Sequence, residues 1–338
     1  FRAKQGRRIM AEECLLVGDI GGTNARFALA NHTHPGYREV LELKCEDFDT
    51  AADAIRHYLS AVGAGAPDAV CLAAAGPLID GSINVTNNHW RVASEALAQD
   101  FDVDAIRLLN DFEAIAYSIP FMTADDRHVV GPQQGVSLAN RSFNVAILGP
   151  GTGLGVAGLI GRGGYLVPVT GEGGHVGFAP ENSRQAEILE VLRRKFERVS
   201  AERLVAGSGI INIYAALAEI CGEHAGEIDA AGIFAAARDH GNDLALETTR
   251  AFFEILGQVA GDLALTLGAN DGVYIAGGIA KRYPDMLMDG RFREAFERKG
   301  RHRHIMERIP TYLITHQQPG LLGAAYCVLE LASSTVSS

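Results

Sequence analysis

The chain has 338 residues, of which 47% are hydrophobic and 21% charged, and its formal net charge is −11. This composition excludes a disordered chain, which would lack the apolar residues needed to build a core. The acidic balance argues against binding to nucleic-acid phosphates, and no apolar run reaches the roughly 18 residues of a membrane span. We therefore expect an enzyme-sized globular protein without nucleic-acid or membrane partners.

The five cysteines are dispersed along the chain, with neither a CxxC pair nor metal-ligand spacing. They are Cys14, Cys45, Cys71, Cys221 and Cys327. Such an odd and scattered set is typical of free core thiols in a reducing compartment, so we expect a cytoplasmic protein.

The first nine residues are basic and lack the apolar stretch of a secretory signal. We interpret residues 1–9 as an expression tag or an upstream extension that precedes Met10, and we leave them out of the fold.

Two glycine-rich segments, 15–29 and 143–157, share one pattern. In each, an apolar run meets a Gly/Thr turn and a second apolar run follows, which predicts a β-hairpin. Their similar positions in the two halves of the chain indicate two related α/β lobes. The alternative is two unrelated hairpins, because glycine turns are common.

Strand and helix patterns alternate between and after the hairpins, which predicts parallel sheet built from βαβ units. The predicted helices are 51–62, 94–101, 112–118, 183–196, 246–267 and 319–331. The predicted strands outside the hairpins are 68–75, 106–109, 311–314 and the run from 272 that ends at a glycine pair.

Three glycine-rich turns are candidates for phosphate binding: 21–23, 149–155 and Gly277-Gly278. Glycine lets backbone N–H groups approach phosphate oxygens and permits positive φ angles, and Thr23 and Thr152 add hydroxyl donors. One such turn alone is more often structural, but three together predict a nucleotide phosphate site. Neither the P-loop nor the strand–GxGxxG–helix pattern fits.

Asp19, Asn110 and Asp111 stand at predicted strand ends. Asp19 can hold Mg²⁺ through water or simply stabilise the following turn. Ligands gather at the carboxyl ends of strands in open α/β sheets, where Asp111 can take a proton from a substrate hydroxyl and Asn110 can bind the substrate. Equally, the pair can cap the helix that begins at Phe112.

Glu172 and His175 lie three residues apart among glycines. A carboxylate accepts hydrogen bonds from hydroxyls, and a neutral imidazole both donates and accepts, so the pair suits a polyol. Zinc is the rival ligand, but the HExxH and CxC patterns are absent. The polar loop 86–90 holds Trp90, for which core packing is the alternative to sugar stacking.

Together these motifs are similar to those of bacterial glucokinases of the hexokinase/actin-like ATPase superfamily, over residues 16–331. The motifs that carry the resemblance are GDIGGTNARFAL (18–29), AAAGP (73–77), TNNHW (86–90), LNDFEAIAY (109–117), LGPGTGLGVA (148–157), GEGGHVGFAP (171–180), SAERLVAGSGI (200–210), AGGIAKR (276–282) and QPGLLGAA (318–325).

The resemblance implies a two-lobed α/β fold of the actin-like ATPase (ribonuclease H-like) type, with the active site in a cleft. The small domain would comprise 10–120 plus 313–331, and the large domain 121–312. The implied activity is ATP- and Mg²⁺-dependent phosphorylation of the 6-hydroxyl of glucose to glucose 6-phosphate and ADP, the entry step of glycolysis, by a homodimer. The alternatives are a kinase for another hexose and a non-catalytic sugar-sensing regulator on the same fold.

The resemblance also assigns residues. It implies that Asp111 is the catalytic base, and that glucose is bound by Asn110, Glu172, His175 and Glu202. The implied ATP-binding residues are Gly18, Asp19, Ile20, Gly21, Gly22, Thr23, Gly151, Thr152 and Gly278. Related sugar kinases carry a cysteine-rich zinc motif after the histidine, but 176–182 contains no cysteine, so we expect no structural zinc.

Overall fold

The computed structural model describes residues 13–32, 34–133, 135–139, 141–239 and 241–335. They form two compact units, which we call unit 1 (described residues up to 121, and 318 onward) and unit 2 (122–317). The segment 1–9, interpreted above as a tag or extension, lies outside the described residues.

A five-stranded sheet in the order β3-β2-β1-β4-β8 forms the centre of unit 1. Its strands are β1 (Leu15–Ile20), β2 (Asn24–Ala30), β3 (Tyr37–Lys44), β4 (Ala69–Ala74) and β8 (Ile106–Asn110). The first three strands are antiparallel, which confirms the predicted hairpin, whereas β1, β4 and β8 run parallel. A second sheet contains β5 (Leu78–Ile79), β6 (Ser82–Asn84) and β7 (Arg91–Ala93).

The helices of unit 1 pack on this sheet and on one another. They are α1 (Ala51–Val62), α2 (Ser94–Phe101), α3 (Asp111–Ser118) and α12 (Pro319–Thr335), with 3-10 turns at η1 (Cys45–Asp47) and η2 (Ile119–Phe121). Helix α1 begins after Thr50, whose side chain accepts a hydrogen bond from the Asp53 N–H, and ends at Gly63 with φ 66°. Trp90 is buried and donates its indole N–H to the Phe48 carbonyl at 3.0 Å, so it packs in the core.

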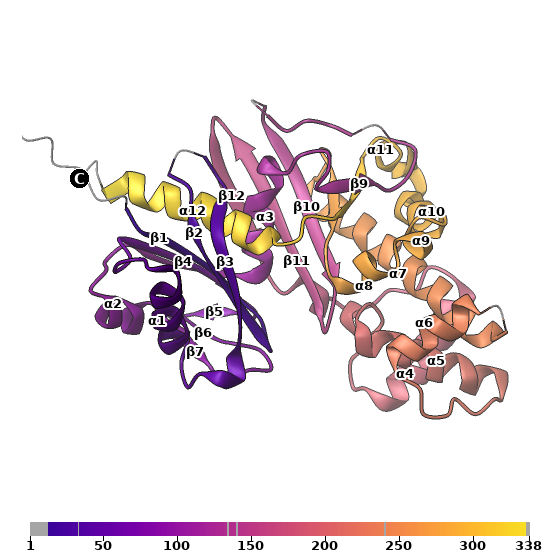
Figure 1. The fold of residues 1–338 in the computed structure, drawn as a ribbon. Coiled ribbons are helices and arrows are strands. Elements are labelled where there is room, and N and C mark those ends of the chain that lie inside the picture. The colour runs from indigo at the N-terminus through magenta and orange to yellow at the C-terminus, as the bar shows by residue number, and fades with distance from the viewer. Residues whose placement is uncertain (1–12, 33, 134, 140, 240, 336–338) are drawn as a thin grey trace, which may run out of the picture. The chain divides into compact units, whose positions relative to one another are not determined.

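The C-terminal helix α12 belongs to unit 1 and contacts α3, β1 and β4 (Figure 1, yellow on indigo). Two glycines of α12, Gly320 and Gly323, let the helix approach β1 and α3 closely. A Cβ at Gly323 would lie 1.8 Å from the Ala114 carbonyl oxygen of α3, and one at Gly320 would lie 2.8 Å from Asp19 Oδ2. The last helix therefore touches both the helix that begins at Asp111 and the strand that carries Asp19.

A six-stranded sheet in the order β12-β11-β10-β13-β14-β9 forms the centre of unit 2. Its strands are β9 (Arg127–Val129), β10 (Phe143–Pro150), β11 (Leu154–Arg162), β12 (Tyr165–Thr170), β13 (Val273–Ile275) and β14 (Thr311–Ile314). The antiparallel pair β10–β11 confirms the second predicted hairpin, and β10, β13 and β14 run parallel.

Helices cover the unit 2 sheet and share its core. They are α4 (Ser183–Lys195), α5 (Gly207–Cys221), α6 (Ala230–Arg238), α7 (Asp243–Leu267), α8 (Gly278–Arg282), α9 (Pro284–Leu287), α10 (Arg291–Glu297) and α11 (Arg303–Met306), with 3-10 turns η3 (Gly173–His175), η4 (Ala201–Arg203) and η5 (Gly300–His302). Helix α7 begins three residues before its predicted start at 246, because Asn242 caps it by accepting from the Ala245 N–H.

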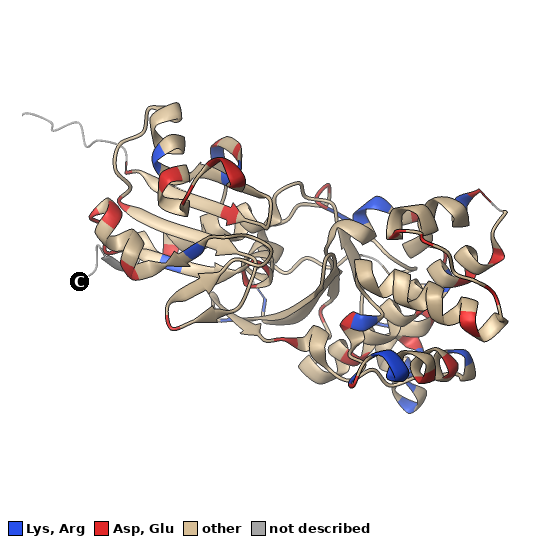
Figure 2. Ribbon diagram, turned by 90° about the horizontal axis from the view of Figure 1, so that it is seen from below, with Lys and Arg blue, Asp and Glu red and all other residues tan. Residues whose placement is uncertain are grey.

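Figure 2 shows basic and acidic residues interspersed over the helices of unit 2. Several form ion pairs, such as Arg298 with Glu254 at 2.8 Å and Lys299 with Glu181 at 2.7 Å. Among the described residues, every helix is too short or too polar to cross a membrane.

The contact between α12 and α3 predicts that Gly323→Ala destabilises the protein. The added methyl would meet the Ala114 carbonyl at 1.8 Å, so the two helices must separate. Overpacking of this kind costs about 1–3 kcal/mol, more than the ~1 kcal/mol that alanine gains over glycine within a helix. Urea unfolding should therefore show a lower free energy of unfolding.

Gly65→Ala is the matched control, because a Cβ there meets nothing within 4 Å and the position lies in the same unit. It should change the free energy of unfolding by less than about 0.5 kcal/mol. A Gly323→Ala protein as stable as this control would show that α12 does not pack on α3 as described.

Candidate functional site

Three loops meet at one edge of the unit 1 sheet. Because β1, β4 and β8 run parallel, their carboxyl ends lie at the same edge, where open α/β sheets bind ligands. The turn 21–23 follows β1, Gly76 follows β4, and Asn110 ends β8. The structure thus brings the first glycine turn and the Asn110-Asp111 pair to one edge.

Asn110 uses both ends of its amide to hold this edge together. Its Oδ1 accepts the Phe112 N–H at 2.9 Å, which caps α3, and its Nδ2 donates to the Gly76 carbonyl at 2.9 Å. The helix-cap interpretation is therefore correct for Asn110. Its Oδ1 can still accept one more hydrogen bond, so capping does not prevent contact with a ligand.

Asp111 is the first residue of α3, and its Oδ1 also accepts the Phe112 N–H, at 3.0 Å. Burial raises the pKa of this carboxyl to about 6, and the charge of Asp19 adds to the effect. Hydrogen bonds from Phe112 and Asn110 oppose the shift without cancelling it. At neutral pH, Asp111 is mostly ionised and has the raised proton affinity of a general base.

Asp19 faces Ala73 of β4 across the sheet and lies beside the first turn of α12, where a Cβ at Gly320 would be 2.8 Å from its Oδ2. Burial raises the pKa of Asp19, whereas the Arg26 guanidinium lowers it. Arg26 in turn pairs with Glu42 at 2.7 Å. Asp19 is thus held close enough to Asp111 for its charge to raise the pKa of the Asp111 carboxyl.

The turn 21–23 is braced from the neighbouring loop. Asn88 Nδ2 donates to the Gly21 carbonyl at 3.2 Å, and a Cβ at Gly22 would lie 3.0 Å from the Thr86 carbonyl oxygen. Neither Gly21 nor Gly22 has a positive φ, so backbone strain does not account for glycine at these two positions. Close packing against Thr86 explains Gly22, whereas a Cβ at Gly21 meets only the Asn24 carbonyl oxygen at 3.4 Å.

In unit 2, three polar side chains gather from two segments. His175 Nε2 lies 4.0 Å from Glu172 Oε2, and His175 Nδ1 lies 3.9 Å from Glu202 Oε1. The segments are joined by the Gly177–Ser200 bridge and by the Ala201 N–H, which donates to the Val176 carbonyl at 2.9 Å. Local sequence gave no sign of Glu202; only the family resemblance indicated it.

The other two glycine turns lie together at the carboxyl ends of β10 and β13. A Cβ at Gly277, where φ is 87°, would be 2.4 Å from the Pro150 carbonyl oxygen, so glycine is required there. Gly278 begins α8, and Gly151 donates its N–H to the Gly153 carbonyl at 2.8 Å. Unit 2 therefore places Gly151, Thr152 and Gly278 at one edge of its sheet.

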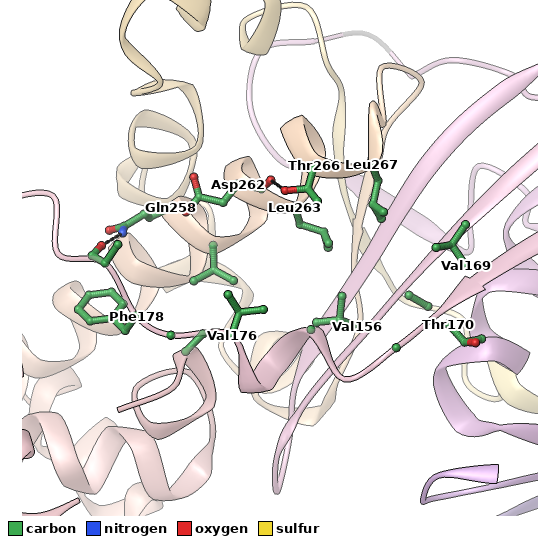
Figure 3. A pocket seen from close by; sticks show the side chains of 17 residues that line it. Val156, Val169, Thr170, Val176, Phe178, Gln258, Asp262, Leu263, Thr266 and Leu267 are labelled. Carbon is green, nitrogen blue, oxygen red and sulfur yellow. Dashed lines mark hydrogen bonds between the residues drawn. The ribbon is translucent and has the colours of Figure 1, made fainter. Parts of the chain in front are cut away.

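A cavity of about 280 Å³ lies behind the segment that carries Glu172 and His175. Val156, Val176 and Leu263 surround it, and Gln258 donates a hydrogen bond to the Ala179 carbonyl at its margin (Figure 3). The described lining is predominantly apolar and includes none of the three polar side chains of the cluster. A polyol bound by the cluster would therefore lie outside this cavity.

The described residues contain no group of three or more His, Cys, Asp or Glu side chains arranged to hold a metal ion. A cation at Asp19 would therefore need other ligands, such as water and phosphate.

Comparison with known proteins places this site in a family. The family model described as Glucokinase matches residues 16–331, nearly the whole chain. The chain belongs to the glucokinase family. It is 42% identical to the glucokinase of Caulobacter sp. (strain K31) over 324 residues, which cover 95% of this chain and 97% of that protein.

Solved structures of glucokinases share the fold. A glucokinase from an Antarctic psychrotroph has a TM-score of 0.86 and 34% identity, covering 95% of this chain and all of that one (100%). A ROK family glucokinase from Streptomyces griseus, in complex with glucose and AMPPNP, has a TM-score of 0.59 and 20% identity, covering 93% and 98% of the two chains. The mixed α/β architecture is thus that of the sugar kinases with the actin-like ATPase fold.

The raised pKa of Asp111 predicts that Asp111→Asn stabilises the protein at neutral and alkaline pH. The ionised carboxylate is disfavoured in the folded state, so its cost is fully present above the folded pKa of about 6 and fades as pH falls toward the unfolded value of 3.8. Because the Asp111 side chain is partly exposed, we expect the free energy of unfolding of Asp111→Asn to exceed that of wild type by only about 1–2 kcal/mol at pH 8. Thermal unfolding from pH 8 to pH 4.5 should show the difference shrink.

Asp104→Asn is the control, because Asp104 is an exposed carboxylate of the same unit. If Asp111→Asn were less stable than wild type at pH 8, the carboxylate would act mainly as a helix cap, which is worth about 1 kcal/mol.

Proposed function

We propose that this member of the glucokinase family transfers the γ-phosphoryl group of ATP to the 6-hydroxyl of glucose, giving glucose 6-phosphate and ADP. The observation that carries the assignment is Asp111, a carboxylate with a pKa of about 6 at the ligand-binding edge of the unit 1 sheet. A general base works best when its pKa lies near the working pH.

Asp111 would accept the proton of the 6-hydroxyl as the oxygen attacks. The bond from this oxygen to the γ-phosphorus forms while the bond from the γ-phosphorus to the β–γ bridging oxygen breaks, which leaves ADP. Phosphoryl transfer needs positioning and charge stabilisation more than covalent help from the protein. Asn110, beside Asp111, would position the sugar with the hydrogen-bonding capacity that capping leaves free.

The cluster of Glu172, His175 and Glu202 would bind the other glucose hydroxyls. Its two carboxylates accept hydrogen bonds, and its imidazole can both donate and accept them. This set of groups matches the hydroxyls of a polyol. The three side chains lie 3.9 and 4.0 Å apart, too far for direct hydrogen bonds, so their polar atoms would be available to a ligand.

Because the base lies in unit 1 and this cluster in unit 2, we propose that both units contribute to one active site. They would act as the two lobes of an actin-like ATPase, with unit 1 as the small domain and unit 2 as the large one; the small domain would then regain the chain at 318, after β14, and not at 313. Closing the lobes on glucose would exclude water, which competes as a phosphoryl acceptor.

The glycine turns would hold the ATP phosphates through backbone N–H groups. These residues are Gly18, Asp19, Ile20, Gly21, Gly22 and Thr23 in unit 1, and Gly151, Thr152 and Gly278 in unit 2. Asp19 fits a Mg²⁺ ion held through water, because it is partly exposed and its charge lies near that of Asp111. When bound, the ion would neutralise phosphate charge.

We also propose that the protein acts as a cytoplasmic homodimer at the entry step of glycolysis. Free cysteines, of which Cys45, Cys71 and Cys327 are buried, support a reducing compartment. Edge strand β12 exposes Tyr165 by 76% and Val167 by 53%, apolar surface that a second copy would cover.

The first prediction from this function concerns Asp111→Asn, measured as ADP release with glucose. Asparagine keeps the shape but cannot take the proton, so kcat should fall by about 10²–10⁴-fold while the Kd for glucose changes less than about threefold. Glucose should be compared with mannose, fructose and N-acetylglucosamine in the wild type, where it should give the highest kcat/KM.

Glu113→Gln is the matched control, since Glu113 lies in the same turn of α3 and pairs with Arg107 at 3.4 Å instead of facing a ligand. It should keep kcat within about threefold. Near-wild-type turnover by Asp111→Asn would overturn the assignment of the base, and glucose binding without ADP release by the wild type would indicate a non-catalytic protein.

A second prediction concerns Gly21→Ala, a position where the protein itself has room for a methyl group. The methyl would obstruct a phosphate oxygen approaching the backbone, so the KM for ATP should rise roughly tenfold, which corresponds to one lost hydrogen bond. The KM for glucose and the Tm should hardly change. Equal losses for both substrates would contradict phosphate binding at this turn.

A further inference from the structure

The carboxylate of Glu202 has two sides that face two different parts of the site. Oε1 lies 3.9 Å from His175 Nδ1, within the polar cluster. Oε2 accepts the backbone N–H of Leu154 at 2.9 Å, at the end of the turn that holds Gly151 and Thr152. One side chain therefore contacts both the proposed sugar cluster and the proposed phosphate turn.

The backbone around this contact leaves space only for Glu202. A Cβ at Gly153 would lie 2.5 Å from Glu202 Oε2, so glycine at 153 lets the carboxylate rest on the turn. A Cβ at Gly174 would lie 2.2 Å from the Leu154 carbonyl oxygen. Leu154 therefore donates its N–H to Glu202, and its carbonyl packs closely against Gly174 in the segment that carries His175.

A second brace acts on the other side of the turn, where the Gly207 N–H donates to the Gly151 carbonyl at 2.9 Å. The brace from Glu202 differs because it comes from a side chain, whereas the other restraints on the turn come from backbone groups. Loss of the Glu202 carboxylate would therefore release the Leu154 end of the turn and leave its backbone contacts in place.

We infer that Glu202 is a positioning residue for the Gly151–Gly153 turn, and that it couples nucleotide binding to sugar binding through one carboxylate. This inference rests on the proposed function. A sugar hydroxyl that binds Oε1 would fix the carboxylate, and the fixed carboxylate would hold the turn ready for phosphate. By linkage, nucleotide would raise the affinity for glucose by the same factor as glucose raises the affinity for nucleotide.

The test measures binding of AMPPNP with Mg²⁺ by calorimetry, without glucose and with saturating glucose. In glucose-free protein, Glu202→Ala should weaken AMPPNP binding by about fivefold or more, because the turn loses its brace. Glu202→Gln should restore the affinity for AMPPNP to within about twofold of wild type, since a neutral amide oxygen still accepts the Leu154 N–H. Its affinity for glucose should stay reduced.

Glu172→Ala is the matched control, because Glu172 belongs to the cluster, is 68% exposed and contacts His175 on the side away from Glu202. This substitution should weaken the binding of glucose. The affinity for AMPPNP in the absence of glucose should stay unchanged. Wild type should bind AMPPNP more tightly with glucose present, and Glu202→Ala should lose this difference.

The inference is overturned if, in the absence of glucose, Glu202→Ala binds AMPPNP with an affinity within twofold of wild type. If Glu202→Ala fails to fold, the Glu202→Gln protein provides the test: its affinity for glucose should fall while its affinity for AMPPNP stays near that of wild type. If both affinities fall equally, the inference is also overturned. Unchanged glucose affinity in both Glu172→Ala and Glu202→Gln would contradict the proposed sugar site instead. A wild type that binds neither ligand would contradict both.

Discussion

Burial of the Asp111 carboxyl group, with the charge of Asp19 nearby, is the constraint on which the candidate site in unit 1 depends. Ionised groups of like charge would normally move apart or find cations, and here burial makes the charges still less favourable. The fold holds them in place with backbone: Asn110 fixes the start of α3, and α12 packs against both carboxylate-bearing elements through glycines. The resulting proton affinity of Asp111 is what a kinase acting on an unactivated hydroxyl needs.

Unit 2 meets a different requirement, that of bringing glycine turns and the polar side chains of Glu172, His175 and Glu202 to one place. It does so with glycines whose absent side chains let other groups approach. Gly277 lies against Pro150, Gly174 against Leu154, and Gly153 against the carboxylate of Glu202. The glycine-rich sequence of this site therefore has several causes, of which ligand approach is only one.

Much of the fold follows from local sequence, because glycine turns between apolar runs give hairpins and apolar periodicity gives helices. The placement of Asp111 at a strand end was also predictable. Its charged neighbour Asp19 comes from another strand, however, so local sequence could not decide whether Asp111 is a general base or a helix cap. The packing of Gly22 could not be predicted for the same reason, since Thr86 contacts it from a separate loop. Glu202 gave no local signal because its partner is the backbone N–H of Leu154, and any residue type can supply such a group.

The position of α12 has a consequence for biosynthesis. Unit 2 is one continuous stretch, 122–317, whereas the sheet that carries Asp19 and the helix that begins at Asp111 are packed by residues made last. During synthesis, all residues of unit 2 are made before α12. Until α12 is made, the sheet face of unit 1 that α12 covers stays exposed. Chains whose translation stops before α12 would lack the helix that packs against the elements carrying Asp19 and Asp111, so we expect unit 1 to remain incomplete in such products.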